Sequence, residues 1–144
     1  MSNEIAVAQD ELIADFELFE DWMDRYQYLI DLGRRLPEFP DELRTEENRI
    51  RGCQSQVWLA AELDGPTVRF FADSDAAITR GLISLLLSVF SGHSPAEIIE
   101  APTDFIDNIG LAENLTLQRR NGLAAMIKQI KFYAIGLKVL AERT

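Results

Sequence analysis

The 144-residue chain contains one cysteine and one histidine, and this scarcity excludes several kinds of chemistry. A single cysteine cannot form an internal disulfide, which is typical of proteins in reducing compartments, so we expect a cytoplasmic protein. Cys53 and His93 cannot together supply the three or four ligands of a zinc site, so we expect no metal. A redox motif with two cysteines is excluded as well.

The chain is also poor in positive charge and in long apolar runs. Its Lys and Arg residues number 14 against 24 Asp and Glu, which gives a net charge of −10. Binding to nucleic acid depends on clustered Lys and Arg, so this balance argues against it. The most apolar segment, residues 81–92, is shorter than the roughly 20 residues that span a bilayer. The N-terminus lacks the pattern of a secretory signal, so we expect no membrane association.

What the chain does contain is helical periodicity. Apolar residues near the N-terminus recur at intervals of three and four and predict one long helix: Leu12, Phe16, Phe19, Met23, Tyr26 and Ile30. Residues 75–90 predict a central apolar helix, residues 94–100 open with a capping box and a proline, and residues 103–110 predict a short helix. Residues 117–143 predict a long C-terminal helix, in which Gly122 marks either the true start or a close approach.

Between these helices lies a predicted β-hairpin. Residues 57–63 alternate between apolar and other side chains, Asp64-Gly65-Pro66 signals a turn, and residues 67–73 are rich in β-branched and aromatic residues. A short third strand is expected around residues 49–51. The whole pattern predicts one α+β domain over residues 1–144, in which a small curved antiparallel sheet packs against helices.

Cys53 stands in the stretch "RIRGCQSQVW", at the start of the first predicted strand. Arg49 and Arg51 flank it and would favour the thiolate, and Gly52 leaves room for another molecule to approach. The next three side chains could hydrogen-bond a charged sulfur: Gln54, Ser55 and Gln56. Thiol exchange suits this setting, because a thiolate attacks sulfur directly and needs no dedicated base.

Two other interpretations of Cys53 remain open on the residues alone. A cysteine-dependent enzyme would need His93 beside Cys53 as its base, although the sequence shows no residue that would orient this histidine. Alternatively, the chain is an interaction module in which the cysteine is incidental. Replacing His93 by alanine separates the first interpretation from thiol exchange, and replacing Cys53 by serine separates the second.

The sequence around Cys53 resembles the active-cysteine signature of the SufE family, which includes CsdE. The signature segment is "ENRIRGCQSQVWLAAELDG". Three further segments resemble the family's N-terminal helix, central region and C-terminal helix: "WMDRYQYLIDLGRRLP", "ADSDAAITRGLISLLLSVFSGHSPAEII" and "LTLQRRNGLAAMIKQIK". The last contains an Arg-x-Asn-Gly element that begins at Arg119. Leu117-Gln118 departs from the Pro-Ser that the family often has there, which leaves the start of the helix in doubt.

The resemblance implies a persulfide relay. A cysteine desulfurase with pyridoxal phosphate, of the SufS or the CsdA type, would pass sulfur to Cys53, and Cys53 would pass it on to an iron–sulfur scaffold. The chain would stimulate the desulfurase as an accessory sulfur carrier rather than act as a stand-alone enzyme, and it would hold no cofactor itself. Arg51, Gly52, Gln54, Ser55 and Gln56 would shape the loop or contact the partner.

The resemblance and the chemistry add two expectations. Arg119 would contact a partner or anchor the loop. A positive charge at a helix start is unfavourable for the helix dipole, so the presence of an arginine there needs another explanation. We expect the Cys53 side chain to turn toward apolar residues at rest and to swing outward on a desulfurase, since a persulfide is easily lost to small reductants. The sequence does not decide between a monomer and a homodimer, nor between the two desulfurase types.

Overall fold

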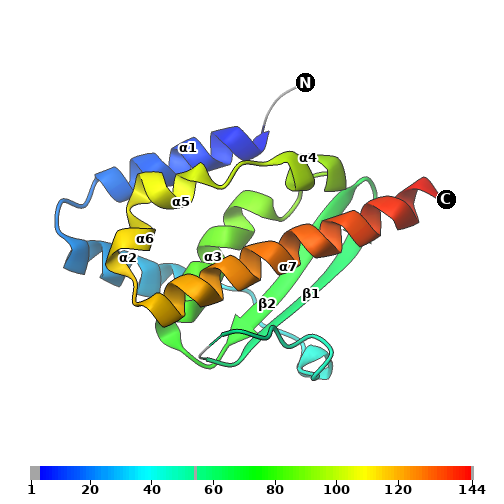
Figure 1. Cartoon of the computed structure of the whole chain (residues 1–144), viewed down its shortest axis with the longest axis horizontal. Helices are drawn as coiled ribbons and strands as arrows, with labels where there is room; N and C mark the ends of the chain where they lie inside the picture. The colour runs from blue at the N-terminus through cyan, green and yellow to red at the C-terminus, as the bar shows by residue number, and fades with distance from the viewer. Residues whose placement is uncertain (1–3, 54, 144) are drawn as a thin grey trace.

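The computed structural model describes residues 4–53 and 55–143 of the chain. Its elements are, in order, α1 (Glu4–Glu17), α2 (Trp22–Arg34), the 3₁₀ turn η1 (Asp41–Leu43), β1 (Val57–Asp64), β2 (Thr67–Ser74), α3 (Ala77–Phe90), α4 (Pro95–Glu100), α5 (Asp104–Ile109), α6 (Leu111–Asn114) and α7 (Leu117–Glu142). Figure 1 shows the hairpin of β1 and β2 beside α3, with α7 running along both. The predicted α+β class with an antiparallel sheet is confirmed. Within the described residues, no helix has the length and apolar character needed to cross a bilayer.

The hairpin follows the alternation of its sequence. Val57 pairs with Ser74 at one end and Asp64 with Thr67 at the turn. The buried apolar residues of the two strands face α3 and the core: Val57, Leu59, Val68, Phe70 and Ala72. The expected third strand is reduced to one bridge between Arg49 and Trp58. The charged residues that precede this bridge favour turns, so the extended segment is short.

The N-terminal apolar stripe is divided between two helices, which corrects the expectation of one. α1 ends at Glu17, and the Asp21 side chain caps α2 by accepting a hydrogen bond from the Met23 amide at 3.1 Å. An aspartate in this position offers the backbone a helix start that competes with continuation of α1. Phe16 is fully buried, whereas Met23 is 78% exposed. The helical spacing therefore continues across a break that apolar periodicity alone does not reveal.

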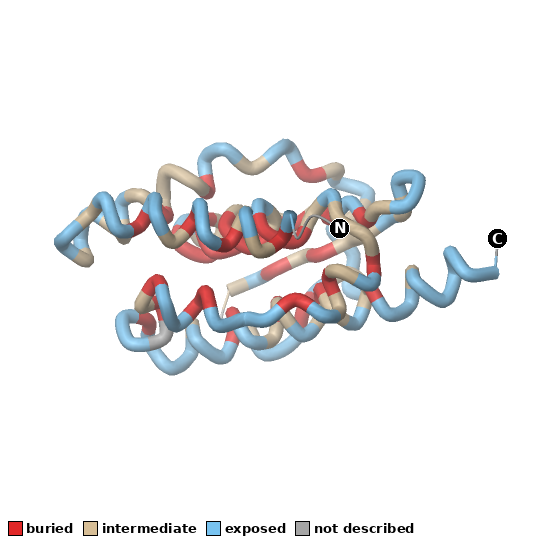
Figure 2. The backbone as a smooth tube through the Cα atoms, turned by 90° about the horizontal axis from the view of Figure 1, so that it is seen from above, coloured by how far each residue is buried: buried red, intermediate tan, exposed pale blue. Residues whose placement is uncertain are grey.

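α2 and α3 cross closely because each has a glycine at the crossing. A Cβ added to Gly33 would lie 2.8 Å from the Gly81 amide nitrogen, and a Cβ added to Gly81 would collide with the Leu29 carbonyl oxygen. The apolar core surrounds α3, and most residues of this helix are buried (Figure 2). This close crossing fixes the position of α3, against which the hairpin and α7 pack.

The predicted start of α4 is observed, and the start of α7, which the sequence left open, lies at Leu117. Ser94 and Glu97 form the capping box of α4. Thr116 caps α7 by accepting a hydrogen bond from the Arg119 amide at 3.2 Å, so Leu117 begins the helix in spite of the unusual Leu117-Gln118. α7 then continues without a break through Gly122 to Glu142.

Candidate functional site

Cys53 lies in the loop of residues 51–56, which enters β1 at the end of the hairpin away from its turn. The loop is closed at its base by the hydrogen bond from the Ile50 amide to the Val57 carbonyl, at 2.8 Å. Asp75 holds its C-terminal side, because its carboxylate accepts from the Gln56 amide at 3.1 Å and its own amide donates to the Gln56 carbonyl at 3.3 Å. Both ends of the Cys53 loop are therefore fixed to the sheet.

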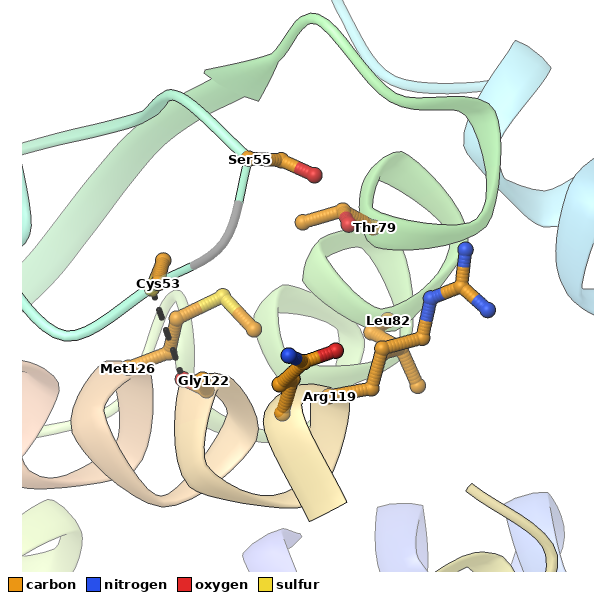
Figure 3. A pocket seen from close by; sticks show the side chains of 8 residues that line it. Cys53, Ser55, Thr79, Leu82, Arg119, Gly122 and Met126 are labelled. Carbon is orange, nitrogen blue, oxygen red and sulfur yellow. Dashed lines mark hydrogen bonds between the residues drawn. The ribbon is translucent and has the colours of Figure 1, made fainter. Parts of the chain in front are cut away.

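The Cys53 side chain turns inward, toward the first half of α7. Its Sγ donates a hydrogen bond to the Gly122 carbonyl over 3.7 Å (Figure 3). A Cβ added to Gly122 would lie 3.6 Å from this sulfur, so the glycine marks a close approach rather than the start of the helix. The backbone before the cysteine turns at Gly52 with a φ of 88°, in the left-handed region that favours glycine. Gly52 therefore allows the backbone to turn in the direction that the loop takes.

Partial burial makes Cys53 a poor thiolate in this position. Removal from water raises the pKa of the Cys53 thiol. A negatively charged sulfur here would also face the partial negative charge of the Gly122 carbonyl oxygen. The predicted help from arginine is wrong: Arg49 pairs with Glu46 at 3.4 Å, and Arg51, 85% exposed, lies 3.9 Å from the same carboxylate. The resting geometry therefore favours the protonated form of the thiol.

A small cavity of about 20 Å³ lies beside Cys53. It is lined by residues of the loop, α3 and α7: Cys53, Ser55, Thr79, Leu82, Gln118, Arg119, Gly122 and Met126 (Figure 3). A cavity of this volume holds about one water-sized group. Thr79, Leu82 and Met126 are buried residues at helical spacing, and nothing in the sequence separates such lining residues from ordinary core.

The other predicted site residues divide into anchored and exposed ones. Arg119 donates a hydrogen bond to the Tyr26 hydroxyl at 3.0 Å, which ties α7 to α2 at the edge of the cavity. Its side chain points away from Cys53 (Figure 3). Ser55 is half-buried and lines the cavity, whereas Gln56 is exposed. Gln54 lies outside the described residues.

His93 lies at the opposite end of the hairpin from Cys53. Its carbonyl accepts a hydrogen bond from the Val68 amide at 2.9 Å, beside the β-turn. Val68 and Ser74 are six residues apart along β2, about 20 Å at the rise of a strand, and Ser74 marks the end that carries Cys53. This distance contradicts a cysteine–histidine enzyme with His93 as base. Among the described residues, no group of three His, Cys, Asp or Glu could hold a metal ion.

Comparison with known proteins matches most of the chain to one family. Residues 10–134 match the Fe-S metabolism associated domain SufE. An uncharacterised SufE-like protein of Rhizobium meliloti (strain 1021) is 46% identical over 132 residues, which cover 88% of this chain and 94% of that protein. A second, from Rhizobium etli, is also 46% identical, over 127 residues that cover 85% of this chain and 86% of the relative.

A solved structure supports the fold. The solution structure of a hypothetical protein from Thermus thermophilus aligns with a TM-score of 0.75, covering 90% of this chain and 94% of the other, at 24% sequence identity. The matched domain extends over the loop of Cys53, over both strands and over the first half of α7. Since the match includes every element that positions the thiol, the resemblance seen in the signature segment is confirmed: the chain belongs to the SufE family, whose domain is associated with iron–sulfur metabolism.

Proposed function

We propose that this protein is a sulfur acceptor that takes persulfide sulfur from a cysteine desulfurase onto Cys53 and passes it on for iron–sulfur cluster assembly. One observation carries the proposal: in a chain of the SufE family, the single thiol lies on an anchored loop beside a cavity with room for about one small group. The donor would be a SufS-like or CsdA-like desulfurase that supplies its own pyridoxal phosphate. The chain would stimulate that enzyme by removing its sulfur.

The transfer step balances without any further reactant. The Cys53 thiolate attacks the outer sulfur of the persulfide on the partner, a bond forms between Cys53 Sγ and that sulfur, and the sulfur–sulfur bond of the partner breaks. The partner cysteine leaves as a thiolate. The proton that Cys53 released when it ionised is then available to protonate this thiolate. No net oxidation occurs, so neither a metal nor a second cysteine in this chain is required.

The inward position of Cys53, against the Gly122 carbonyl, favours a movement of the loop before the step takes place, and the raised pKa of the buried thiol agrees with this. In the inward position the thiol is protonated and only partly accessible, whereas attack requires a thiolate that reaches the partner. An outward swing of residues 51–56 about their fixed ends would bring the sulfur into water or into the partner's site and lower its pKa. After transfer, the return swing would place the added sulfur in the cavity beside Thr79, Leu82 and Met126.

The remaining loop residues would contact the desulfurase or shape the loop. Arg51 and Gln56 are exposed and available for contact with the desulfurase. Gly52 sets the direction of the loop, and Ser55 lines the cavity. Gln54 belongs to the same signature, and we assign it to loop shaping on the resemblance alone.

The test is the intact mass of the protein after incubation with a cysteine desulfurase and cysteine. We expect the mass of one or more sulfur atoms to be added, to disappear with a thiol reductant, and to be absent in Cys53→Ser. His93→Ala serves as the matched control, because its side chain lies at the other end of the hairpin and sulfur acceptance should survive. No adduct with SufS-like and CsdA-like desulfurases would refute the proposal.

The same variant distinguishes a carrier from an interaction module. If Cys53 were incidental, Cys53→Ser would stimulate the desulfurase as the parent protein does. We expect it instead to keep its fold, by circular dichroism, and to lose stimulation. Cys53 is half-buried and replaced by a side chain of similar size, so an effect on folding should be small.

A further inference from the structure

Thr79 is a buried polar residue in the first turn of α3, and its hydroxyl has no hydrogen-bond partner among the described residues. Only 7% of the residue is exposed. The two other buried polar residues of the described chain are both paired. Gln9 donates to the Pro102 carbonyl at 2.9 Å. The Ser74 hydroxyl accepts from the Ala76 amide at 3.2 Å. Buried polar groups in native proteins are normally paired, so the free hydroxyl of Thr79 calls for an explanation.

The Thr79 side chain lines the small cavity beside Cys53. Figure 3 shows it leaving α3 toward the loop that carries Cys53 and Ser55. A sulfur added to Cys53 lies about 2 Å from its Sγ, which is the length of a sulfur–sulfur bond. The cavity of about 20 Å³ has room for about one such group, and Cys53 and Thr79 line it together. The outer sulfur of a persulfide and the free hydroxyl would therefore share one small space.

The surroundings of the cavity favour a negative charge beyond Cys53 Sγ. The first turns of two long helices line it, that of α3 through Thr79 and that of α7 through Gln118 and Arg119. The N-terminal turn of a helix carries partial positive charge, and in α3 no side chain caps it. The acceptor of the site, the Gly122 carbonyl, lies at the inner sulfur, Cys53 Sγ. A persulfide bears its charge on the outer sulfur, which here would meet donors.

We propose that Thr79 binds the outer sulfur of the Cys53 persulfide and holds it as an anion, with the threonine hydroxyl as the hydrogen-bond donor. The inference rests on the proposed function, because it concerns the species that sulfur acceptance leaves on Cys53. The persulfide loses its proton to water, no electrons are transferred, and the sulfur–sulfur bond stays intact. A hydrogen bond to a charged acceptor is stronger than one between neutral groups and shifts an equilibrium roughly tenfold or more.

The other donors that line the cavity are less suited to this role. The Arg119 guanidinium is committed to the Tyr26 hydroxyl at 3.0 Å and points away from the thiol. Gln118 is exposed, so water can satisfy its amide. Ser55 is half-buried and belongs to the loop that would move. Thr79 instead stays on α3, whose position is fixed by the close crossing with α2.

An anionic outer sulfur would be protected from small reductants by its charge as well as by burial. A reductant such as glutathione attacks as a thiolate, and a negative charge on the target sulfur repels it. When the loop swings outward, the sulfur leaves the Thr79 hydroxyl, which remains on α3. The persulfide is then more easily protonated and more open to attack by the thiolate of an acceptor. Sulfur would thus be retained in the closed loop and released from the open one.

The first test compares how fast loaded variants lose sulfur. Protein that carries the Cys53 persulfide is separated from the desulfurase, so that the rate of loading does not enter, and is mixed with glutathione while the intact mass is followed. Thr79→Val keeps the shape of the side chain but removes the donor, and it should lose sulfur roughly tenfold faster than the parent. Thr79→Ser restores a hydroxyl and should recover most of the retention. Thr67→Val, at the turn of the hairpin, is the matched control and should behave as the parent.

The pH dependence separates a hydrogen bond from altered packing. The near-ultraviolet absorbance of the persulfide anion, titrated with pH, gives the pKa of the persulfide. Thr79→Val should raise this pKa because the anion loses a donor, whereas loosened packing, which admits water, would not raise it. In the parent protein the persulfide should have a lower pKa in the folded chain than in urea, and this comparison needs no variant.

The outcomes distinguish this inference from the proposed function. A parent protein that takes up no sulfur would overturn both. If the parent is loaded, the role of Thr79 alone is overturned by a persulfide pKa that is no lower in the folded chain than in urea. The same conclusion follows if Thr79→Val leaves the pKa of the persulfide unchanged, whether or not sulfur is lost faster.

Discussion

The two halves of α7 carry different residues for different contacts. Around Gly122 the helix lacks a side chain, and the space admits the Cys53 sulfur at the Gly122 carbonyl. Beyond Lys128 the helix instead carries large apolar side chains on two faces, one buried and one exposed. The comparison teaches that one helix can make room for a thiol where it lacks a side chain and expose large apolar side chains where its opposite face is already buried.

Filling the space at Gly122 should have the largest effect. A leucine there would overlap the Cys53 sulfur, so Gly122→Leu should push the loop outward, raise the rate of Cys53 alkylation roughly tenfold or more, and cost about 1–3 kcal/mol of unfolding free energy. Iodoacetamide kinetics followed by mass spectrometry measure the first effect, and urea unfolding the second.

Gly136→Leu is the matched control for this substitution. It lies in the same helix at an exposed position, where an added Cβ meets no atom within 4 Å, so the reactivity of Cys53 should stay at the parent value. Gly122→Ala should also have little effect, because its Cβ would make an ordinary contact of 3.6 Å with the sulfur. Equal alkylation rates in Gly122→Leu and Gly136→Leu would mean that α7 does not shield the thiol.

Lys131 lies between the two halves and should matter for stability alone. Its ammonium donates to three carbonyls at the end of α4: Ile98 at 3.1 Å, Ile99 at 3.0 Å and Ala101 at 2.6 Å. Lys131→Met leaves these acceptors without their charged donor and should lower the free energy of unfolding by about 2 kcal/mol. Urea unfolding measures the loss, and the exposed Lys138→Met should change it by less than about 0.5 kcal/mol. A similar loss in both variants would contradict this role.

Arg119 at the start of α7 should show whether anchoring or partner contact dominates there. Tyr26→Phe removes only the hydroxyl that accepts from Arg119 and should cost about 1 kcal/mol in urea unfolding. If Arg119 is an anchor, Arg119→Ala and Tyr26→Phe should lose similar stability and both should accept sulfur. If it also contacts the desulfurase, only Arg119→Ala should lower the rate of sulfur acceptance.

The pH dependence of stability should show the smallest effect. Because burial raises the pKa of Cys53 in the folded state, the unfolded thiol ionises first. The contribution to stability is complete below about pH 8.5, the pKa of an unperturbed thiol, and is lost as the pH rises through the folded value. Urea unfolding from about pH 7 to about pH 10 should therefore decline more for the parent than for Cys53→Ala. An identical decline would mean that the thiol is not desolvated.

Local patterns predicted the hairpin and the helices α3, α4, α5 and α7, but neither the break between α1 and α2 nor the short helix α6. The alternation before Asp64 fixed the hairpin, and Ser94 with Glu97 fixed the start of α4. The signature around Cys53 also identified the family before any geometry was available. Contacts between distant segments were not predictable in the same way. The partner of Arg49 is Glu46 rather than the thiol, since a turn brings those two side chains together.

The position of His93 shows the same limit over a longer distance. Its sequence neighbourhood gave no sign that the Val68 amide would bind its carbonyl, about 20 Å from the Cys53 end of the hairpin. For Gly122 the sequence left two alternatives, the true start of the helix or a close approach, because a glycine inside a long helix lowers its stability. The contact with Cys53 decides for the close approach.

The glycine crossing of α2 and α3 has a consequence for how the chain can vary. In a saturation mutagenesis experiment that scores sulfur transfer, Gly81 and Cys53 should both reject nearly every replacement. A parallel score of protein abundance should separate them, because substitutions at Gly81 collide with the Leu29 carbonyl and remove the folded protein, whereas those at Cys53 leave it abundant and inactive. Intolerance at Gly81 would then reflect a requirement of the fold, and intolerance at Cys53 a requirement of the chemistry.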